Sequence, residues 1–598
     1  MPPNSRVCDR CIKKKVKCNQ QRPNCSRCSE AGCPCTYSKE KGKPGPRGAR
    51  TKTRLNLAAR REAANLKTHQ TSHDGAWVPV SSQSHIPPEN YPFFDDNSSM
   101  QPFTPYLNDL GLSFSPSPFM NQSVFPGYCL SPIQERNILS RFFEDIHSAI
   151  PLFQRRKFLK AYDDGAACRD LIVTIVTVTA KILGPISFWQ SEDIDVCMNS
   201  LLAATAYENA PSSLQTDLDR YRQECLLAAY AFHQFPGSSS WMRIGRLTRR
   251  AYDMGLNQIE NCDLCSIYDA GPMTEAEIEN WRCIWWCVYC LDSYSNIAIG
   301  APFLVDLESI DTSLVRRSCE DGEVPNVPKL FLPDDLSQLW RVAQEVVSRP
   351  GEKGFNMHII TTTILRQAGS TLTLRCTKKR VHTKAEALRS ALASLRLALP
   401  PGCLNPAQNA LTAESSAHHA TRLTNLLHLH MTRLIISVPR DFGIDETNWL
   451  DGWQQSLASC QDIVKIIEQW NNQFSSRVDP AICLIVLYAL WVMNLHRRCI
   501  TDATSPLLAS LARAENIMLL FLEQFSRIWT LPSVLIQLFK NWTTDDDPLT
   551  YADVDRLINQ FRMPLHPKTL RQACTYSLDG TDLAGAGGLN MVDNFVAI

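Results

Sequence analysis

Apolar residues recur at steps of three and four along most of the chain beyond about residue 130. Steps of this size place side chains on one face of an α-helix, because one turn contains 3.6 residues. We find no convincing set of alternating strand positions and no recurring βαβ pattern, so the pattern predicts an all-α domain over residues 131–542. The clearest stripe consists of Trp449, Trp453, Leu457, Cys460, Val464, Ile467 and Trp470.

The region before this domain has no such period. Residues 70–130 are rich in Ser, Pro, Asn and aromatic residues, which predicts a disordered linker. Aromatic and acidic residues stand together there, for example Phe93, Phe94 and Asp95, and either an activation motif or an inert tether accounts for them. Residues 39–69 form a basic arm and a short helix with few apolar heptad positions, so we expect at most a weak homodimer through it.

The end of the chain, residues 543–598, is predicted to be an acidic segment followed by a mostly disordered tail. Residues 543–561 combine five aspartates with apolar residues such as Leu549, Leu557 and Phe561. An acidic amphipathic segment can fold onto a coactivator. It can equally form the last helix of the domain, and both alternatives stay open at this point.

Membrane and enzyme functions find no support in the pattern. The longest apolar run, residues 481–493, has thirteen residues, short of the roughly 20 that cross a bilayer. We therefore expect a buried core helix there and no membrane contact, and the N-terminus lacks the apolar segment of a secretory signal. No GxSxG, HExxH or phosphate-loop motif is present, and the glycine-rich stretch 585–588 lies in the polar tail, so we expect no enzyme.

Charge is distributed unevenly although the formal net charge is only +1. Residues 1–70 contain 18 Lys and Arg against 4 Asp and Glu, whereas the remaining residues contain 43 and 56. A basic head on an acidic body indicates that the head has a polyanionic partner.

Seven of the 23 cysteines lie within the first 35 residues. Six of them repeat the spacing C-x2-C-x6-C twice, and Cys33 falls outside this repeat. Without a secretory signal, such a cluster indicates a metal site more than a disulfide framework. Six thiolates can hold two tetrahedral zinc ions if two of them bridge, whereas a single four-ligand finger would ignore two well-spaced cysteines. The predicted ligands are Cys8, Cys11, Cys18, Cys25, Cys28 and Cys35.

This stretch resembles the fungal zinc binuclear cluster family of transcription factors. Beside the six cysteines, the resemblance includes the run Lys13–Lys15 before the third cysteine, Pro23 between the halves and Tyr37 after the last cysteine. It covers residues 1–38, and it implies a DNA-binding domain folded by two Zn²⁺ ions. By resemblance, Cys8 and Cys25 bridge the ions, Cys11 and Cys18 complete one site, and Cys28 and Cys35 complete the other.

The resemblance also implies how the head contacts double-stranded DNA. The first helix, expected over residues 9–15, would enter the major groove, where lysine donates well to guanine O6 and N7. The family typically recognises a CGG triplet, and Lys14 and Lys15 occupy the matching positions. The basic arm would add phosphate affinity and a nuclear import signal. Candidates for phosphate contact are Lys13, Lys17, Arg10, Arg22 and Arg27.

The helical region resembles the fungal-specific regulatory domain, or middle homology region, that accompanies such clusters. The matching stretches are residues 142–159, 240–256 and 281–311. Together the two resemblances imply a nuclear transcription factor at RNA polymerase II promoters that regulates a metabolic or secondary-metabolite gene cluster, with activation expected. Coactivators and a small-molecule effector of the helical body are further candidate partners. The alternatives are repression in response to a small molecule and broad control of carbon catabolism.

Overall fold

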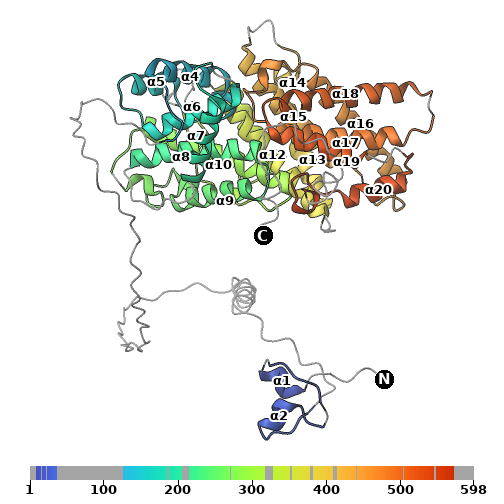
Figure 1. Cartoon of the computed structure of the whole chain (residues 1–598). Coiled ribbons are helices and arrows are strands. Elements are labelled where there is room, and N and C mark those ends of the chain that lie inside the picture. Colours follow the sequence, from blue (N-terminus) through green and yellow to red (C-terminus); the bar gives the residue numbers. More distant parts are fainter. Residues whose placement is uncertain are drawn as a thin grey trace, which may run out of the picture. The chain divides into compact units, whose positions relative to one another are not determined.

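The computed structural model describes two separate units of the chain, a small unit within Met1–Ser115 and a large unit within Pro116–Ile598 (Figure 1). In the small unit it describes residues 8–36 without 15 and 22. In the large unit it describes residues 125–570, which we call the helical domain, without 185–186, 205–213, 270, 317–326, 350–352, 377–381, 409–413, 440, 503 and 544–546. The predicted basic arm with its short helix, most of the linker and the end of the tail lie outside the described residues.

Regular secondary structure in the described residues is helical, and they contain no β-strand, so the predicted all-α fold is confirmed. The small unit contains α1 (Asp9–Lys14) and α2 (Ser26–Glu30). The α-helices of the large unit are α4 (Pro132–Asp145), α5 (Arg155–Asp163), α6 (Arg169–Leu183), α7 (Ser191–Ala204), α8 (Leu214–Gln234), α9 (Ser238–Asp253), α10 (Glu275–Ile299), α11 (Leu339–Ser348), α12 (Lys353–Cys376), α13 (His382–Ala398), α14 (Pro401–Leu404), α15 (Ser416–Ser437), α16 (Glu446–Ile467), α17 (Ile482–Arg498), α18 (Pro506–Ser526), α19 (Thr530–Trp542) and α20 (Tyr551–Gln560). Short 3-10 turns are η1 (His147–Ala149), η2 (Leu256–Gln258), η3 (Ser266–Tyr268), η4 (Leu307–Ser309), η5 (Leu336–Gln338) and η7 (Asn472–Phe474).

Several helix ends follow from local sequence. At the start of α4, the Ser131 hydroxyl accepts from the backbone N–H of Gln134, whose side chain accepts in return from the backbone N–H of Ser131. Thr274 and Glu277 form the same capping box at the start of α10. Such boxes satisfy N–H groups that have no partner inside the helix. Gly300 ends α10 with a φ of 75°, a conformation that glycine adopts without a Cβ clash.

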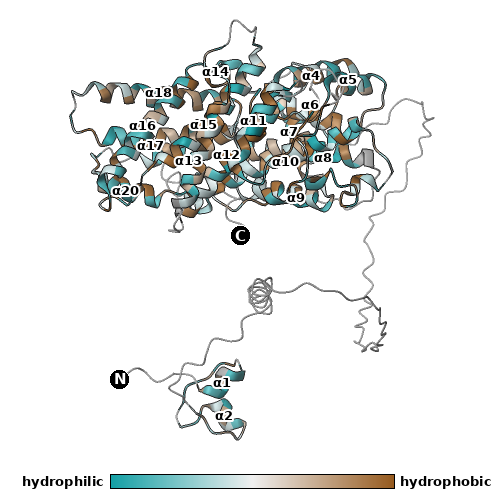
Figure 2. Cartoon of the chain, turned by 180° about the vertical axis from the view of Figure 1, so that it is seen from behind, coloured by the Kyte–Doolittle hydropathy of each residue, from teal (hydrophilic) through white to brown (hydrophobic). Residues whose placement is uncertain are grey.

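The helices of the domain form two lobes, α4–α10 and α11–α20, which Figure 1 shows on opposite sides of the domain. In the first lobe α6 packs against α4 and α8, and in the second α15 packs between α12 and α16. Helices α10 and α12 pack against each other where the lobes meet. Figure 2 shows hydrophobic and hydrophilic stretches on the helices of both lobes, as expected for helices that bury one face.

The predicted apolar elements are buried. In α16 the stripe residues Trp449, Trp453 and Cys460 are each less than 5% exposed. The longest apolar run forms most of α17, whose residues 482–496 are all buried in the core, as predicted. No helix in the described part of the chain has the length and apolar character needed to cross a bilayer.

A buried ion pair fastens the two lobes together. Asp292 of α10 is fully buried and accepts from the backbone N–H groups of Leu304 and Val305, each at 3.2 Å. Arg366 of α12 donates to the same carboxylate at 3.1 Å and to the carbonyl of Val305 at 2.6 Å. The Asp292 carboxylate therefore brings the chain after α10 back onto the helix and joins it to α12.

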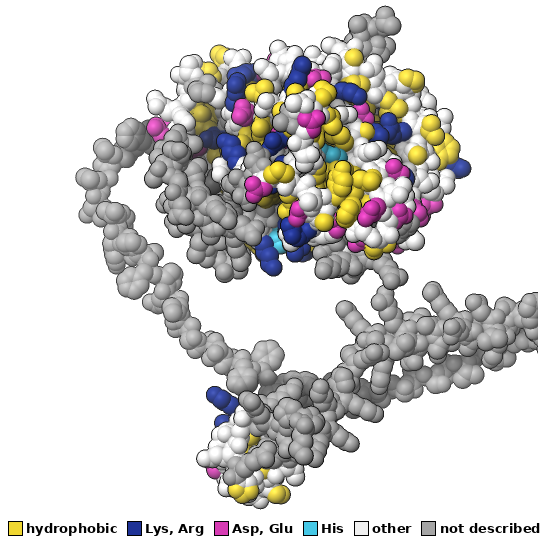
Figure 3. Space-filling model, turned by 90° about the vertical axis from the view of Figure 1, so that its right-hand side faces the viewer, with side chains coloured by type: hydrophobic (Ala, Val, Ile, Leu, Met, Phe, Trp, Pro, Cys, Tyr) yellow, Lys and Arg dark blue, Asp and Glu magenta, His cyan; other side chains and the backbone are white. Residues whose placement is uncertain are grey.

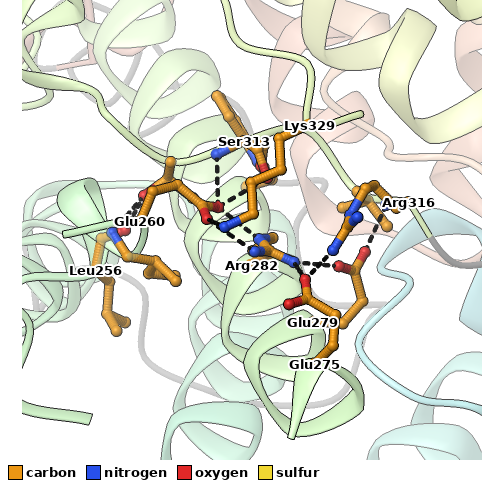
Figure 4. A network of polar contacts seen from close by, with 12 residues as sticks. Leu256, Glu260, Glu275, Glu279, Arg282, Ser313, Arg316 and Lys329 are labelled. Atoms are coloured by element: carbon orange, nitrogen blue, oxygen red, sulfur yellow. Dashed lines mark hydrogen bonds and ion pairs between the residues drawn. The ribbon is translucent and has the colours of Figure 1, made fainter. Parts of the chain in front are cut away.

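A second polar network, the Arg282 network, surrounds the start of α10 (Figure 4). The buried guanidinium of Arg282 forms ion pairs with Glu260, Glu275 and Glu279. Arg316 and Lys329 extend the network to Glu275 and Glu260. Because Arg316 and Lys329 follow η4 in the chain, the network holds these two positions against the start of α10.

The packed part of the chain continues past Trp542, the expected end of the domain. The acidic segment contains α20, whose Val554 is fully buried. Trp449 of α16 donates to the Asp555 carboxylate at 3.3 Å, and the ring of Phe561 packs against Trp491 of α17. The sequence leaves two alternatives open for the acidic segment, a coactivator-binding segment and the last helix of the domain. Residues 551–560 form a helix that packs on the domain. Residues 561–570 follow it into the core, where Leu565 is 1% exposed, because this stretch still carries apolar side chains.

Candidate zinc centre and nucleic-acid interface

The small unit brings all six predicted cysteines together. Their sulfur atoms form two groups of four, and within each group all sulfurs lie within 4.8 Å of one another. Both groups contain Cys8 and Cys25. Within the described part of the chain, these are the two clusters of His, Cys, Asp or Glu with metal-site geometry. One group is completed by Cys11 and Cys18, and the other by Cys28 and Cys35.

The two halves of the repeat achieve this with the same local structure. In each half the C-x2-C pair lies at the start of a short helix, so both sulfurs point to one side of the first turn. The third cysteine of each half follows in chain without regular secondary structure. A backbone hydrogen bond from Asp9 N–H to the Thr36 carbonyl, at 2.9 Å, closes the unit by joining its two ends.

The geometry fits two tetrahedral ions. All six cysteines are free thiols. Sulfurs at the corners of a tetrahedron, each about 2.3 Å from a central zinc, lie about 3.8 Å apart. The Sγ–Sγ distances are 3.9 Å for Cys8–Cys25, 3.7 Å for Cys8–Cys28, 3.7 Å for Cys11–Cys25 and 3.9 Å for Cys8–Cys18. The donor set therefore has the spacing and the thiolate chemistry that zinc requires.

Backbone N–H groups support the sulfurs from outside. The N–H of Cys25 donates to the Cys35 sulfur at 3.2 Å and lowers the pKa of the Cys35 thiol to about 7. The N–H groups of Cys8 and Gln20 lower the pKa of Cys18 to about 7 in the same way. Zinc binds the thiolate form, so these N–H groups favour the protonation state that a ligand needs.

Two asparagines also support the cluster, and the sequence pattern alone did not single them out. The Asn24 side-chain carbonyl accepts from the N–H of Cys35 at 3.0 Å, and that of Asn19 accepts from the N–H of Ser26 at 3.1 Å. The sequence feature that could have pointed to them is their position next to a ligand, because Asn19 directly follows Cys18 and Asn24 directly precedes Cys25. Cys33 lies outside both groups, and its thiol donates to the Ala31 carbonyl at 3.2 Å.

Of the seven predicted DNA contacts, four have exposed side chains, one is half-buried and two lie outside the described residues. Lys13 and Lys14 lie in the last turn of α1 with exposed side chains, and Lys17 and Arg27 are exposed as well. Figure 3 shows Lys and Arg side chains gathered at one end of the described surface of the small unit. Arg10 is half-buried and donates to the backbone carbonyl of Arg27 at 3.3 Å, which joins α1 to α2. Lys15 and Arg22 lie outside the described residues.

Comparison with known proteins identifies both units. Residues 6–44 match the fungal Zn(2)-Cys(6) binuclear cluster domain. Residues 139–385 match the fungal specific transcription factor domain. The chain therefore contains a fungal Zn(2)-Cys(6) binuclear cluster domain and a fungal specific transcription factor domain. A binuclear cluster of this kind holds two zinc ions. The domain that contains it binds DNA, and transcription factors of this family function in the nucleus. Both matched families consist of transcription factors and not of enzymes.

Several curated transcription factors are similar to about half of this chain. The citrinin biosynthesis transcriptional activator mrl3 of Monascus ruber is 21% identical, over 55% of this chain and 67% of its own length. The azaphilone cluster-specific transcription factor azaR of Aspergillus niger is 25% identical, over 49% and 57%. The sorbicillinoid biosynthetic cluster transcription factor 1 of Penicillium rubens is 22% identical, over 56% and 60%. The chain thus spans about six tenths of the curated relatives it matches, and no solved structure matches it.

Proposed function

We propose that this protein activates a secondary-metabolite gene cluster by binding CGG-type triplets in RNA polymerase II promoters. The observation that carries the DNA-binding part is the exposed lysine pair at the end of α1, on a helix that the cysteine cluster holds in place. The pathway part is supported by the relatives, which are named as regulators of citrinin, azaphilone and sorbicillinoid biosynthesis.

The proposed zinc ligands are the six cysteines of the repeat, with Cys8 and Cys25 as the bridging pair. The two groups of four sulfurs support this choice, because Cys8 and Cys25 are the members that both groups share. Bridging reduces the demand from eight thiolates to six, which is the number that the repeat supplies.

The proposed base contacts are those of Lys14 and Lys15, with Lys13, Lys17, Arg22 and Arg27 at phosphates. A short helix whose C-terminal end carries exposed ammonium groups can present them to guanine O6 and N7 in the major groove. Phosphate contacts position the unit without selecting a sequence. Arg10 is the exception among the basic candidates, because one of its N–H groups already holds the two halves of the cluster together.

Lys14→Ala tests the base-contact role. We expect it to weaken binding to CGG DNA by about 1–3 kcal/mol more than binding to a scrambled site, since it removes a base-specific donor. Lys17→Ala is the matched control, and it should weaken both complexes alike and lower the salt slope by about 0.9. Titrations of both variants at several salt concentrations measure this. Equal losses on the two DNAs for Lys14→Ala would contradict base recognition.

A genome-wide chromatin map of the protein in its own organism, combined with transcript levels after deletion of the gene, tests the pathway. Occupied promoters confined to one gene cluster, whose transcripts fall on deletion, are the expected result. Occupancy spread over many unlinked metabolic promoters would instead support broad control of carbon catabolism. Transcripts that rise on deletion would make the protein a repressor.

A further inference from the structure

The helical domain contains a cavity of about 700 Å³ where its two lobes meet. Helices α4, α6, α8 and α10 of the first lobe line it, together with α12, α15 and the chain before α17 from the second. Figure 1 shows α10 and α12 near the middle of the domain, between the other helices of the two lobes. The exposed residues Ser148, Arg155 and His418 stand among buried lining residues, so the cavity opens to solvent on this side. Ligand pockets for organic molecules fall in this size range.

The walls of the cavity are mainly apolar. Phe143, Ile182 and Leu226 line it from the first lobe, and Met357 and Leu429 line it from the second. Each of these side chains is at least nine-tenths buried. Apolar surface removed from water contributes roughly 25 cal/mol per Å², so these walls favour a ligand with an apolar body.

The charged groups near the opening compensate one another. Arg155 and Glu144 form an ion pair at 2.9 Å, and Arg477 pairs with Asp145 at 3.0 Å. Lys353 is exposed. A charged ligand therefore meets no uncompensated buried charge of opposite sign here.

The deeper polar groups have close partners as well. The Asp479 carboxylate lies 2.9 Å from the His233 ring of α8 and accepts from the backbone N–H of Ala481 at 2.8 Å, and the His233 contact joins the two lobes across the cavity wall. Arg422 pairs with Glu414 at 2.6 Å, and both side chains are close to nine-tenths buried. Burying an extra, unpaired charge beside such pairs is unfavourable, so the cavity selects against ionic ligands.

Neutral hydrogen-bonding groups occupy the interior. Burial lowers the pKa of His358 to about 4, so its ring is uncharged at neutral pH, and its Nε2 lies 3.4 Å from the Tyr294 hydroxyl. Thr361 and Asn425 also line the cavity, and the Thr361 hydroxyl donates to the Asn425 side-chain oxygen at 3.2 Å. Groups of this kind match hydroxyl and carbonyl groups.

We propose that this cavity binds an uncharged, mainly apolar organic molecule that carries hydroxyl or carbonyl groups. Because residues of both lobes line the site, the bound molecule contacts both and stabilises the domain. The proposal concerns the helical domain alone, and it holds whether or not the head recognises CGG triplets. The zinc cluster takes no part in binding the cavity ligand.

Two fluorescent dyes that share one aromatic framework test the proposal on the full-length, zinc-loaded protein. N-phenylnaphthylamine is uncharged, and anilinonaphthalene sulfonate adds one negative charge. We expect saturable binding of one uncharged dye per chain, with a Kd at least tenfold lower than that of the sulfonate. No saturable binding, or a sulfonate that binds as tightly, would overturn the proposal.

Two substitutions that fill the cavity locate the dye. Ala229→Phe, from α8, and Ala417→Phe, from α15, each place a ring where a half-buried alanine lines the cavity. Each is expected to raise the Kd of the uncharged dye at least tenfold. The control is Ala387→Phe on the exposed side of α13, which should leave the Kd unchanged. Circular dichroism identifies a cavity variant that misfolds. If one of the two misfolds, the Kd of the other variant tests the site. An unchanged Kd in a folded cavity variant would place the dye elsewhere and refute the site.

Discussion

Cys33 and Cys35 are separated by one residue, yet their surroundings differ completely. The sulfur of Cys35 belongs to one group of four and accepts from the N–H of Cys25. The thiol of Cys33 points away from both groups and donates to a backbone carbonyl. At the scale of single residues, the ability to hold a metal therefore depends on direction and on the supporting N–H groups, and not on residue type alone.

Serine substitutions at these two positions test the difference. We expect Cys33→Ser to keep two zinc ions per chain, and Cys35→Ser to keep at most one, because a hydroxyl is a poor substitute for a thiolate at zinc. Elemental analysis of the purified variants measures the zinc content. Full zinc content in Cys35→Ser together with a loss in Cys33→Ser would reverse the ligand assignment.

Helix α10 shows how one element organises the first lobe. Its start carries Arg282, which no solvent reaches, and its middle carries Asp292, which closes the following turn. Hydrogen bonds from Arg282 and Lys329 outweigh the effect of burial and lower the pKa of Glu260 to about 2. The stabilising contribution of Glu260 is therefore complete above its ordinary pKa of 4.5 and is lost as the pH falls through about 2.

Arg282→Met should lower the free energy of unfolding by about 3–5 kcal/mol, because it leaves buried carboxylates without their cation. Denaturant unfolding followed by circular dichroism measures the change. The control is Arg556→Met in α20, where an exposed pair with Asp553 is removed at a cost of less than about 1 kcal/mol. Arg282→Met should also weaken the stability loss between pH 4.5 and 2. Similar effects of both substitutions would show that the network contributes little.

The whole molecule consists of two units with different sources of stability. The buried core of the small unit is made of cysteines alone among the described residues. The helical domain has one continuous core of aliphatic and aromatic side chains. A unit without an apolar core cannot offset the conformational entropy of its chain, so zinc must supply the folding free energy of the head.

Removal of zinc should therefore affect the two units differently. A strong chelator is expected to abolish binding to CGG DNA while the melting midpoint of the helical domain stays unchanged. DNA titration and thermal circular dichroism on the same full-length sample measure the two effects, and added zinc should restore binding. A large fall in the melting midpoint would contradict independent folding of the two units.

The sequence by itself determined the features that depend on neighbours in the chain. The helical period, the capping boxes at Ser131 and Thr274 and the doubled cysteine spacing each act within a few turns, so the residues that form them stand close together in the sequence. The same locality allows the spacing to predict the ligand set, because each half of the cluster is a short helix followed within seven residues by the third cysteine.

Only the tertiary structure decided which distant residues meet. Lys329 reaches Glu260 across 69 residues, and Arg477 reaches Asp145 across 332. No periodic pattern specifies such pairs, because they depend on how whole helices pack. The same holds for the choice of α20 as part of the domain, and for the cavity, whose walls come from segments that are far apart in the chain. Its shape and its balance of charge exist only after the two lobes have come together.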